Sequence, residues 1–356
     1  MRAEVGVGRR VGTHLGYDCR DQNPTRVSGP QERDFAVPLP APQLPARKVI
    51  IDCDPGIDDA MALAMALFDP RLEVVAVTAV GGSVTAEQAT ANVQAIVPFL
   101  DPPRLPRMGI ATGDGMLPDK PYSLHGVDGL GGIELPRVQL HGGHHSEKVI
   151  WECLKAFPRE ITILALGPLT NIARVLQRDP SVAELIGDIV ISGGTTHASG
   201  NASAVADFNF YCDPAAARHV VREPMTKTLV PLETSSQLLM GFELLDQLPA
   251  EYTRVGKLLR QMLPHAFRAH RQILGSEGVW LHDAVALVAV TNPELFERVS
   301  VVADVESAGD LTAGMLVVDR RQIRQARPNA DLLVGCDAAA VQDCILRSCA
   351  AAADAT

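Results

Sequence analysis

The sequence predicts an α/β protein with a doubly wound, mostly parallel central sheet and flanking helices. Two observations predict this fold class. From residue 47 onward, short apolar segments rich in β-branched residues alternate with segments of helix-forming residues. Each apolar segment before the last part of the chain is followed by a crossover helix, which implies parallel strands with right-handed connections. Sheets of this kind bind ligands beyond the carboxyl ends of their strands.

Strands and helices are expected to alternate over most of the chain. The expected strands are buried apolar runs at residues 48–53, 72–80, 107–110, 161–166, 189–192 and 226–232. The expected helices cover residues 58–68, 85–100, 146–157 and 169–177, and another begins at Asp213-Pro214. Breaks are predicted at Pro55-Gly56, Gly81-Gly82, Pro102-Pro103, Gly167-Pro168 and Gly193-Gly194.

The rest of the chain is less regular. Residues 235–275 are expected to be mainly helical, and an apolar helix is expected at 284–290. Strands are then expected near 299–305, 314–318 and 332–335, with a closing helix near 338–348. The glycine-rich residues 112–143 are predicted to form a long loop, and long loops in compact domains are often functional. We interpret His141, His144 and His145 as part of a solvated loop that leads into the next helix, since no cysteine or oxygen-rich partner accompanies them.

Composition sets limits on function. The chain has 356 residues, of which 47% are hydrophobic, and we expect residues 47–356 to form one domain. Residues 1–46 are rich in proline and are expected to be a disordered extension. The net charge of −10 argues against a nucleic-acid partner. The absence of an apolar run of about 18 residues argues against a membrane span. The seven scattered cysteines indicate reduced thiols and a cytoplasmic protein.

Four carboxylates lie at the C-terminal end of the first expected strand and in the first turn of the next helix, namely Asp52, Asp54, Asp58 and Asp59. Two acids at a helix N-terminus can simply complement the helix dipole, which accounts for Asp58 and Asp59 but not for the other pair. Like charges this close repel each other unless a cation holds them. Hard oxygen ligands with no cysteine or histidine among them favour calcium or magnesium over zinc. The spacing does not match an EF-hand loop.

More polar residues are expected at the same edge of the sheet. The loop 193–209 follows an expected strand and carries Asn201, Asp207 and Asn209. Their amide and carboxylate groups suit the hydroxyls of a sugar, although such residues also populate ordinary turns. His282 and Asp283 precede an apolar helix, where a histidine and a capping aspartate are commonly structural.

Residues 52–60, Asp-Cys-Asp-Pro-Gly-Ile-Asp-Asp-Ala, resemble the N-terminal signature of the nucleoside hydrolases, the inosine-uridine-preferring nucleoside N-ribohydrolase family. Four further segments resemble motifs of that family in the family's order, namely 125–131, 165–171, 200–209 and 282–283. The resemblance therefore extends from about residue 47 to the C-terminus. It implies the nucleoside hydrolase fold and a homodimer or homotetramer.

The resemblance also implies a set of metal-binding and catalytic residues. A calcium ion would be held by Asp54, Asp59, Asp283 and the backbone carbonyl of Leu166. Asp54 would in addition be the general base that activates a water on the metal. His282 would lie beside the departing base and could assist its protonation.

The implied substrate-binding residues surround the sugar and the base. Asp58, Asn201, Asp207 and Asn209 would bind the ribose hydroxyls, and His125 would lie on the base side of the pocket. Asp52 would have a supporting role. The implied reaction is calcium-dependent hydrolysis of the N-glycosidic bond of nucleosides, as in purine and pyrimidine salvage.

Two positions depart from the family pattern. Ser83 stands where the family usually has asparagine, and Asp207 stands where it usually has glutamate. Both positions contact the sugar in relatives, so Ser83 is a further candidate substrate-binding residue. We expect ordinary ribonucleosides to be cleaved less efficiently, or the preferred sugar to differ.

Other functions remain open at this stage. A haloacid-dehalogenase-type phosphohydrolase also places paired aspartates after its first strand, but Asp54 is followed here by Pro55-Gly56. A nucleoside- or sugar-binding protein without turnover, or a hydrolase of a non-standard N-glycoside, would also fit the altered sugar residues. Trp280 is expected in the core, with a place beside the base as the alternative.

Overall fold

The computed structural model describes residues 45–113, 124–136, 143–322 and 326–356. Residues 44–356 form one compact unit. The expectation of a disordered extension at residues 1–46 falls almost entirely outside the described residues, as does His141. No helix in these described ranges combines the length and the apolar character that a bilayer crossing needs.

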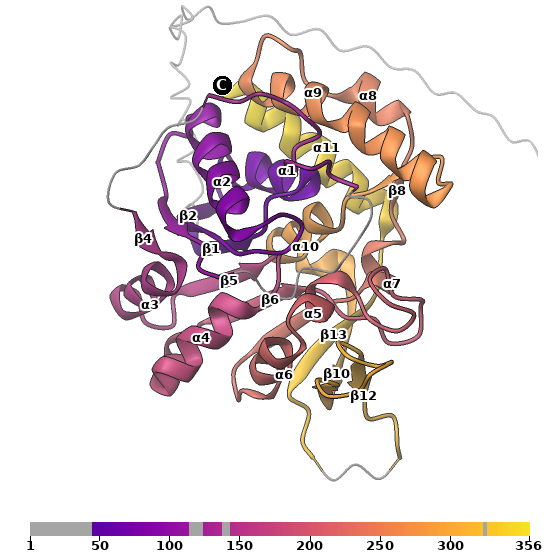
Figure 1. Cartoon of the computed structure of the whole chain (residues 1–356). Helices are drawn as coiled ribbons and strands as arrows, with labels where there is room; N and C mark the ends of the chain where they lie inside the picture. The colour runs from indigo at the N-terminus through magenta and orange to yellow at the C-terminus, as the bar shows by residue number, and fades with distance from the viewer. Residues whose placement is uncertain (1–44, 114–123, 137–142, 323–325) are drawn as a thin grey trace, which may run out of the picture. The chain divides into compact units, whose positions relative to one another are not determined.

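The centre of the fold is a mixed, mostly parallel sheet, drawn in Figure 1. Its nine strands lie in the order β10-β13-β7-β6-β5-β1-β2-β3-β4. The parallel strands are β1 (Arg47–Cys53), β2 (Leu72–Ala79), β3 (Arg107–Ile110), β4 (His144–His145), β5 (Ile161–Ala165), β6 (Asp188–Ser192), β7 (Lys227–Val230) and β13 (Ala330–Cys336). Only β10 (Phe296–Val301) is antiparallel to its neighbour in this sheet, pairing with β13. The predicted doubly wound α/β fold is thereby confirmed.

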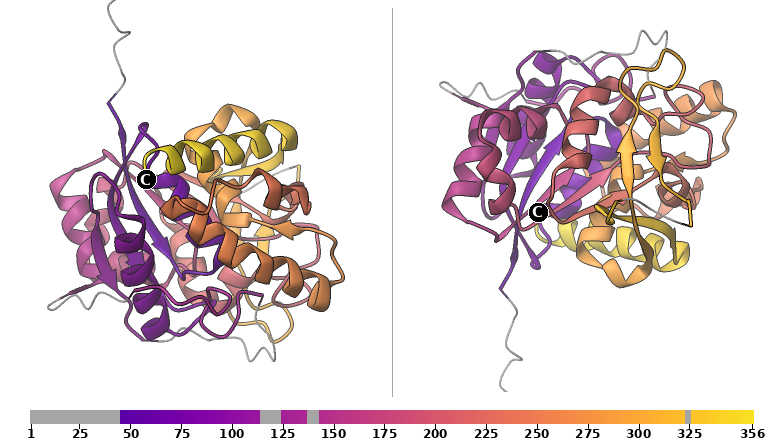
Figure 2. Two further views of the ribbon diagram at one scale, coloured as in Figure 1. Left: turned by 90° about the horizontal axis from the view of Figure 1, so that it is seen from above. Right: turned by 90° about the horizontal axis from the view of Figure 1, so that it is seen from below.

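Helices cover both faces of the sheet, as Figure 2 shows from above and below. One apolar core contains buried residues of α1 (Ile57–Ala66), α2 (Ala86–Leu100), α9 (Arg254–Ala269), α10 (His282–Thr291) and α11 (Ala338–Asp354). The other contains buried residues of α3 (Ser146–Ala156), α4 (Thr170–Arg178) and α6 (Pro214–Arg222). Val49 and Ile51 enter the first core and Ile50 enters the second, as the alternation of side chains along a strand requires. Burial on both faces explains the continuous apolar run in β1.

Several short elements differ from the sequence prediction. His144 and His145 form edge strand β4 rather than part of a loop, because Gly109 and Ile110 of β3 pair with them. The expected strand 299–305 is divided between β10 and β11 (Ala303–Val305), which pairs with β12 (Leu316–Val318). The expected helical region 235–275 includes β8 (Leu239–Met240), which pairs with β9 (Val279–Trp280). Three short helices complete this part, namely α5 (Phe208–Cys212), α7 (Leu232–Ser235) and α8 (Glu243–Gln247).

The topology brings one set of loops together. β1, β2, β5, β6 and β7 are parallel, so the loops after them meet at one edge of the sheet. The connection from β1 leads to β2 on one side, whereas β5 lies on the other side. A crevice at such a switch point is the usual ligand site of doubly wound sheets. The residues that follow β1 and β5 are Asp54 and Leu166.

Candidate active site

The turn between β1 and α1 is built around Asp59. Its Oδ2 accepts a hydrogen bond from the Gly56 N–H at 2.8 Å, which caps the start of α1. Its Oδ1 is buried and has no hydrogen-bond partner among the described residues. A buried carboxylate oxygen without a partner is costly, and a bound cation would remove that cost.

Three carboxylates converge beside this oxygen. Asp58, Asp59 and Asp283 each place one oxygen within 4.8 Å of the others. Asp58 is half-buried, whereas the other two are buried. Asp283 comes from the first turn of α10 and also accepts a hydrogen bond from Ser192 Oγ at 3.1 Å. This set of oxygens is the kind that calcium prefers.

Asp54 belongs to the same electrostatic cluster. Burial, followed by the charge of Asp59, raises the pKa of Asp54 well above its usual range. Burial and the neighbouring Asp58 raise the pKa of Asp59 to about 7 and that of Asp283 well above its usual range. Charged carboxylates in this arrangement require a compensating positive charge, so the donor set fits a divalent cation.

Asp54 is held in a narrow space. A Cβ on Gly82 or on Gly167 would lie against the Asp54 carboxylate oxygens, so both positions require glycine. The Ser83 N–H donates to Asp54 Oδ2 at 2.5 Å, and the Ser83 hydroxyl also hydrogen-bonds this carboxylate. Ser83 therefore binds the predicted catalytic base, a contact that the sequence prediction of a sugar ligand did not include.

Asp207 and Asn209, at the start of α5, hydrogen-bond the backbone at the carboxyl ends of β5 and β6. Asp207 Oδ1 accepts from the Gly194 N–H at 2.7 Å and Oδ2 accepts from the Asn209 N–H at 2.9 Å. Asn209 Nδ2 donates to the Leu166 carbonyl at 2.6 Å and to the Ser192 carbonyl at 2.9 Å. The carbonyl predicted to bind calcium is thus fixed by a residue predicted to bind ribose. Burial raises the pKa of Asp207 to about 7.

The loop before Asp207 is anchored by Glu233 of α7. Glu233 Oε1 accepts from the backbone N–H groups of Thr196 at 2.5 Å, His197 at 2.6 Å and Ala198 at 3.0 Å. Although burial opposes the effect, these donors lower the pKa of Glu233 to about 2. Asn201, the remaining predicted ribose ligand, is an exposed residue of this loop and is not part of the buried cluster.

Two histidines, His125 and His282, interact with the charge of Asp58. His125 Nδ1 accepts from the Ile57 N–H at 3.1 Å and lies 3.7 Å from Asp58 Oδ1. His282 Nδ1 lies 2.8 Å from Ser235 Oγ. Burial lowers the pKa of His282 to about 4, an effect that Asp58 opposes. We call His125 and His282 the imidazole side of the site, and Asp54, Asp59 and Asp283 its carboxylate side.

Sequence reasoning missed His270. This buried residue begins a short π-helix, His270–Leu274, directly after α9. Burial lowers the pKa of His270, and the charges of His125 and Asp58 have smaller, opposite effects on it. His270 in turn lowers the pKa of His282. Trp280 lies beside it, with ring centroids 6.0 Å apart, and is half-buried rather than part of the core. A π-helix frequently marks a functional site, but its hydrogen bonds leave no sequence signature.

Asp52 holds neighbouring elements of the fold together through hydrogen bonds. Its Oδ1 accepts from Thr78 Oγ1 at 2.6 Å and from Asn171 Nδ2 at 2.8 Å. The Asn171 amide also donates to the Ala79 carbonyl at 2.9 Å. Asp52 thus links β1, β2 and α4, which agrees with the supporting role predicted for it.

Comparison with known proteins identifies the family. Residues 49–343 match the model of the family described as inosine-uridine preferring nucleoside hydrolase. The chain belongs to this family. The nucleoside hydrolase resemblance predicted from the motifs is confirmed, and the phosphohydrolase alternative is excluded.

Known nucleoside hydrolases are similar to this chain over most of its length. It is 36% identical to uridine nucleosidase 1 of Arabidopsis thaliana over 77% of this chain and 82% of that protein. It is 36% identical to a non-specific ribonucleoside hydrolase of Salmonella agona over 76% and 87% of the two chains. Among solved structures, a plant nucleoside hydrolase matches with a TM-score of 0.79 and 28% identity over 86% of this chain and 99% of that chain. This nucleoside hydrolase is therefore an enzyme of the N-ribohydrolase type.

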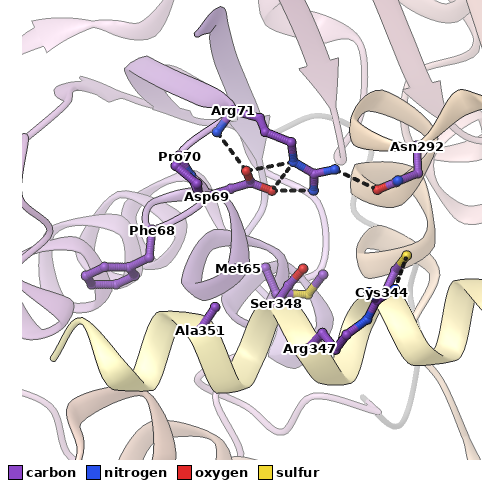
Figure 3. A pocket seen from close by; sticks show the side chains of 10 residues that line it. All are labelled: Met65, Phe68, Asp69, Pro70, Arg71, Asn292, Cys344, Arg347, Ser348 and Ala351. Carbon is purple, nitrogen blue, oxygen red and sulfur yellow. Dashed lines mark hydrogen bonds and ion pairs between the residues drawn. The ribbon is translucent and has the colours of Figure 1, made fainter. Parts of the chain in front are cut away.

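A separate pocket of about 260 Å³ lies at the other end of α1, against α11 (Figure 3). Its Arg71 guanidinium is already bound by Asp69 and by Asn292. Arg347 is paired with Asp343 at 2.8 Å. Because both cations have protein partners, this pocket offers little net charge to a ligand.

Proposed function

We propose that this nucleoside hydrolase cleaves the N-glycosidic bond of nucleosides to free base and ribose in a calcium-dependent reaction. The observation that carries the proposal is the cluster of Asp54, Asp58, Asp59 and Asp283, in which one buried oxygen has no described partner. The uridine nucleosidase and the non-specific ribonucleoside hydrolase among its relatives support nucleosides as the substrate class.

Asp54, Asp59, Asp283 and the Leu166 carbonyl would hold the calcium ion. When bound, calcium would supply positive charge to these carboxylates and lower the pKa of a coordinated water. Asp54 is the proposed general base, since its carboxylate would lie beside a water on the ion and could accept that water's proton. Ser83 and the two glycines beside Asp54 fix the direction of its carboxylate.

The remaining residues of the carboxylate side would surround the ribose. Cleavage of an N-glycosidic bond develops positive charge on the sugar, which nearby carboxylates such as Asp58 stabilise. Asn209 would bind a sugar hydroxyl in addition to holding the Leu166 carbonyl, and Asn201 would contribute from the loop. Asp207 would act mainly by holding Gly194 and Asn209 in place, because both its oxygens accept backbone hydrogen bonds.

The base would lie over the imidazole side. His282 is half-buried there, and its Nδ1 is held by Ser235 Oγ at 2.8 Å, which leaves Nε2 as the ring nitrogen without this contact. His282 would therefore meet the departing base with Nε2. In the cation-free protein its low pKa keeps this ring neutral at pH 7.

Release of reducing sugar from a panel of ribonucleosides and 2′-deoxynucleosides tests this function. The expected result is release of ribose from at least one ribonucleoside by the native chain and its loss in Asp54→Ala. The exposed Asp310→Asn is the matched control and should retain activity. No release from any nucleoside, with calcium still bound, would instead favour the binding-protein alternative or a non-standard N-glycoside.

A further inference from the structure

Ser192 is a polar residue on an apolar face of the sheet. It is the last residue of β6, and its backbone is paired with Val230 of β7. Because side chains alternate along a strand, Ser192 faces the same side of the sheet as Val190, which belongs to the apolar core that contains α10. Ser192 is only 5% exposed. A hydroxyl buried at such a position lowers stability unless it forms a hydrogen bond.

The partner of this hydroxyl is Asp283, one of the proposed calcium ligands. Ser192 Oγ donates to Asp283 Oδ1 at 3.1 Å, and Asp283 is itself buried. The carboxylate of an aspartate rotates easily about its last side-chain bond, since that torsion has no sharply preferred angle. A donor fixed to a paired strand limits this rotation, so β6 sets the direction of the Asp283 carboxylate.

The backbone of Ser192 is connected to a second proposed ligand. Asn209 Nδ2 donates both to the Ser192 carbonyl at 2.9 Å and to the Leu166 carbonyl at 2.6 Å. The N–H of the same peptide unit as the Leu166 carbonyl, that of Gly167, donates to the Asp52 carbonyl at 3.4 Å. Ser192 is therefore connected by hydrogen bonds to two proposed ligands, one from α10 and one from the end of β5.

We propose that Ser192 is a positioning residue of the calcium site. Its hydroxyl directs the Asp283 carboxylate toward the ion, and its carbonyl shares the Asn209 amide with the Leu166 carbonyl. The inference rests on the proposed function and adds a residue that acts through the ligands rather than on the ion. Loss of a donor that orients a metal ligand typically weakens metal binding by about ten- to hundredfold. Ser192 should therefore affect the affinity for calcium more than the chemical step.

Calcium titration of the chelator-treated protein by isothermal titration calorimetry tests the inference. In Ser192→Ala, which removes the hydroxyl, we expect the Kd for calcium to rise by about tenfold or more. Ser192→Thr keeps a hydroxyl and should restore most of the affinity. Ser146→Ala is the matched control, because it also removes a buried serine hydroxyl, which donates to the Ala79 carbonyl at 2.7 Å. Its Kd for calcium should equal that of the native chain.

Steady-state kinetics provides a second readout. The calcium concentration that gives half-maximal ribose release should rise in Ser192→Ala in parallel with the Kd, whereas kcat at saturating calcium should stay near the native value. A serine that only stabilised the fold would lower the Tm of the chelated protein without changing the calcium Kd of the folded chain.

The outcomes separate this inference from the proposed function. A native Kd for calcium in a folded Ser192→Ala would overturn the inference and leave the proposed function intact. If Ser192→Ala does not fold, Ser192→Cys decides in its place, because its thiol donates only weakly and a native Kd there would also overturn the inference. Failure of the native chain to bind calcium would contradict the calcium-dependent function, and this inference would fall with it.

Discussion

Ser83 shows how a single residue changes the environment of Asp54, the proposed general base. The family resemblance predicts Ser83 as a sugar ligand with a shorter side chain than the usual asparagine. In the structure its N–H and its hydroxyl both bind Asp54, so the residue orients a carboxylate rather than leaving its hydroxyl for the sugar. The hydroxyl is a donor that stabilises the charged form of Asp54.

Ser83→Ala removes the hydroxyl but keeps the backbone N–H. We expect kcat to fall by about tenfold with little change in KM, because one hydrogen bond to a charged group contributes about 1.5–3 kcal/mol. Steady-state kinetics on the best nucleoside measures this. A rise in KM at constant kcat would show instead that Ser83 acts on the sugar. Ser83→Asn, the family residue, is the informative partner variant, since a gain in kcat/KM would support the predicted loss of efficiency.

At the scale of elements, α7 connects the two sides of the site. Glu233 holds the loop 196–198, Thr234 Oγ1 donates to the Leu333 carbonyl at 2.7 Å, and Ser235 contacts His282. Three consecutive residues of one short helix therefore fix the loop before the proposed ribose-binding residues, a strand of the sheet and the histidine that we propose lies beside the base.

Glu233→Ala should loosen the loop on the ribose side. Because Oε1 accepts several backbone hydrogen bonds, we expect KM to rise by about tenfold or more, with a smaller effect on kcat. Glu233→Gln keeps one carbonyl oxygen and should be milder. Glu243→Ala, at an exposed residue of α8, is the control. Unchanged KM in a folded Glu233→Ala would contradict this role.

The elements also show what sequence could predict. Apolar runs bounded by glycine and proline identified β1, β3 and α1 closely, since local propensity and burial agree there. β4 was not predicted, because His144 and His145 become a strand only through pairing with β3. His270 was not singled out from the sequence, because the π-helix that holds it forms through backbone hydrogen bonds that leave no sequence signature. The motif residues are predictable because they lie at strand ends, whereas the contacts of Ser83 and Asp207 depend on the folded loops.

At the scale of the whole molecule, the buried carboxylates lower the stability of the folded protein when they are ionised and no cation is bound. The folded pKa of Asp52, Asp59 and Asp207 is raised from 3.8 to about 7 by burial. A carboxyl with a raised folded pKa contributes full stability below its unfolded pKa, and this contribution is lost as pH rises through the folded value. The cation-free protein should therefore lose stability between about pH 4 and pH 7.

Calcium should reverse this trend at the cluster, because it binds the ionised carboxylates. We expect the increase in Tm caused by calcium to be larger at pH 8 than at pH 5, with about 2.7 kcal/mol of stabilisation when calcium is at a hundred times its Kd. Thermal melts with calcium or with chelator measure the effect. Asp59→Asn should abolish most of it, and the exposed Asp310→Asn should not. An equal calcium shift at both pH values, or one that persists in Asp59→Asn, would place the ion elsewhere.

The central claim is that the carboxylate cluster is a calcium-dependent centre for cleaving nucleosides. The most direct test is ribose release from uridine by the native chain after chelation and again after calcium is restored, beside Asp283→Ala treated in the same way. Our account predicts loss of activity with chelator, recovery with calcium in the native chain, and no recovery in Asp283→Ala. Full ribose release in the presence of chelator would contradict it.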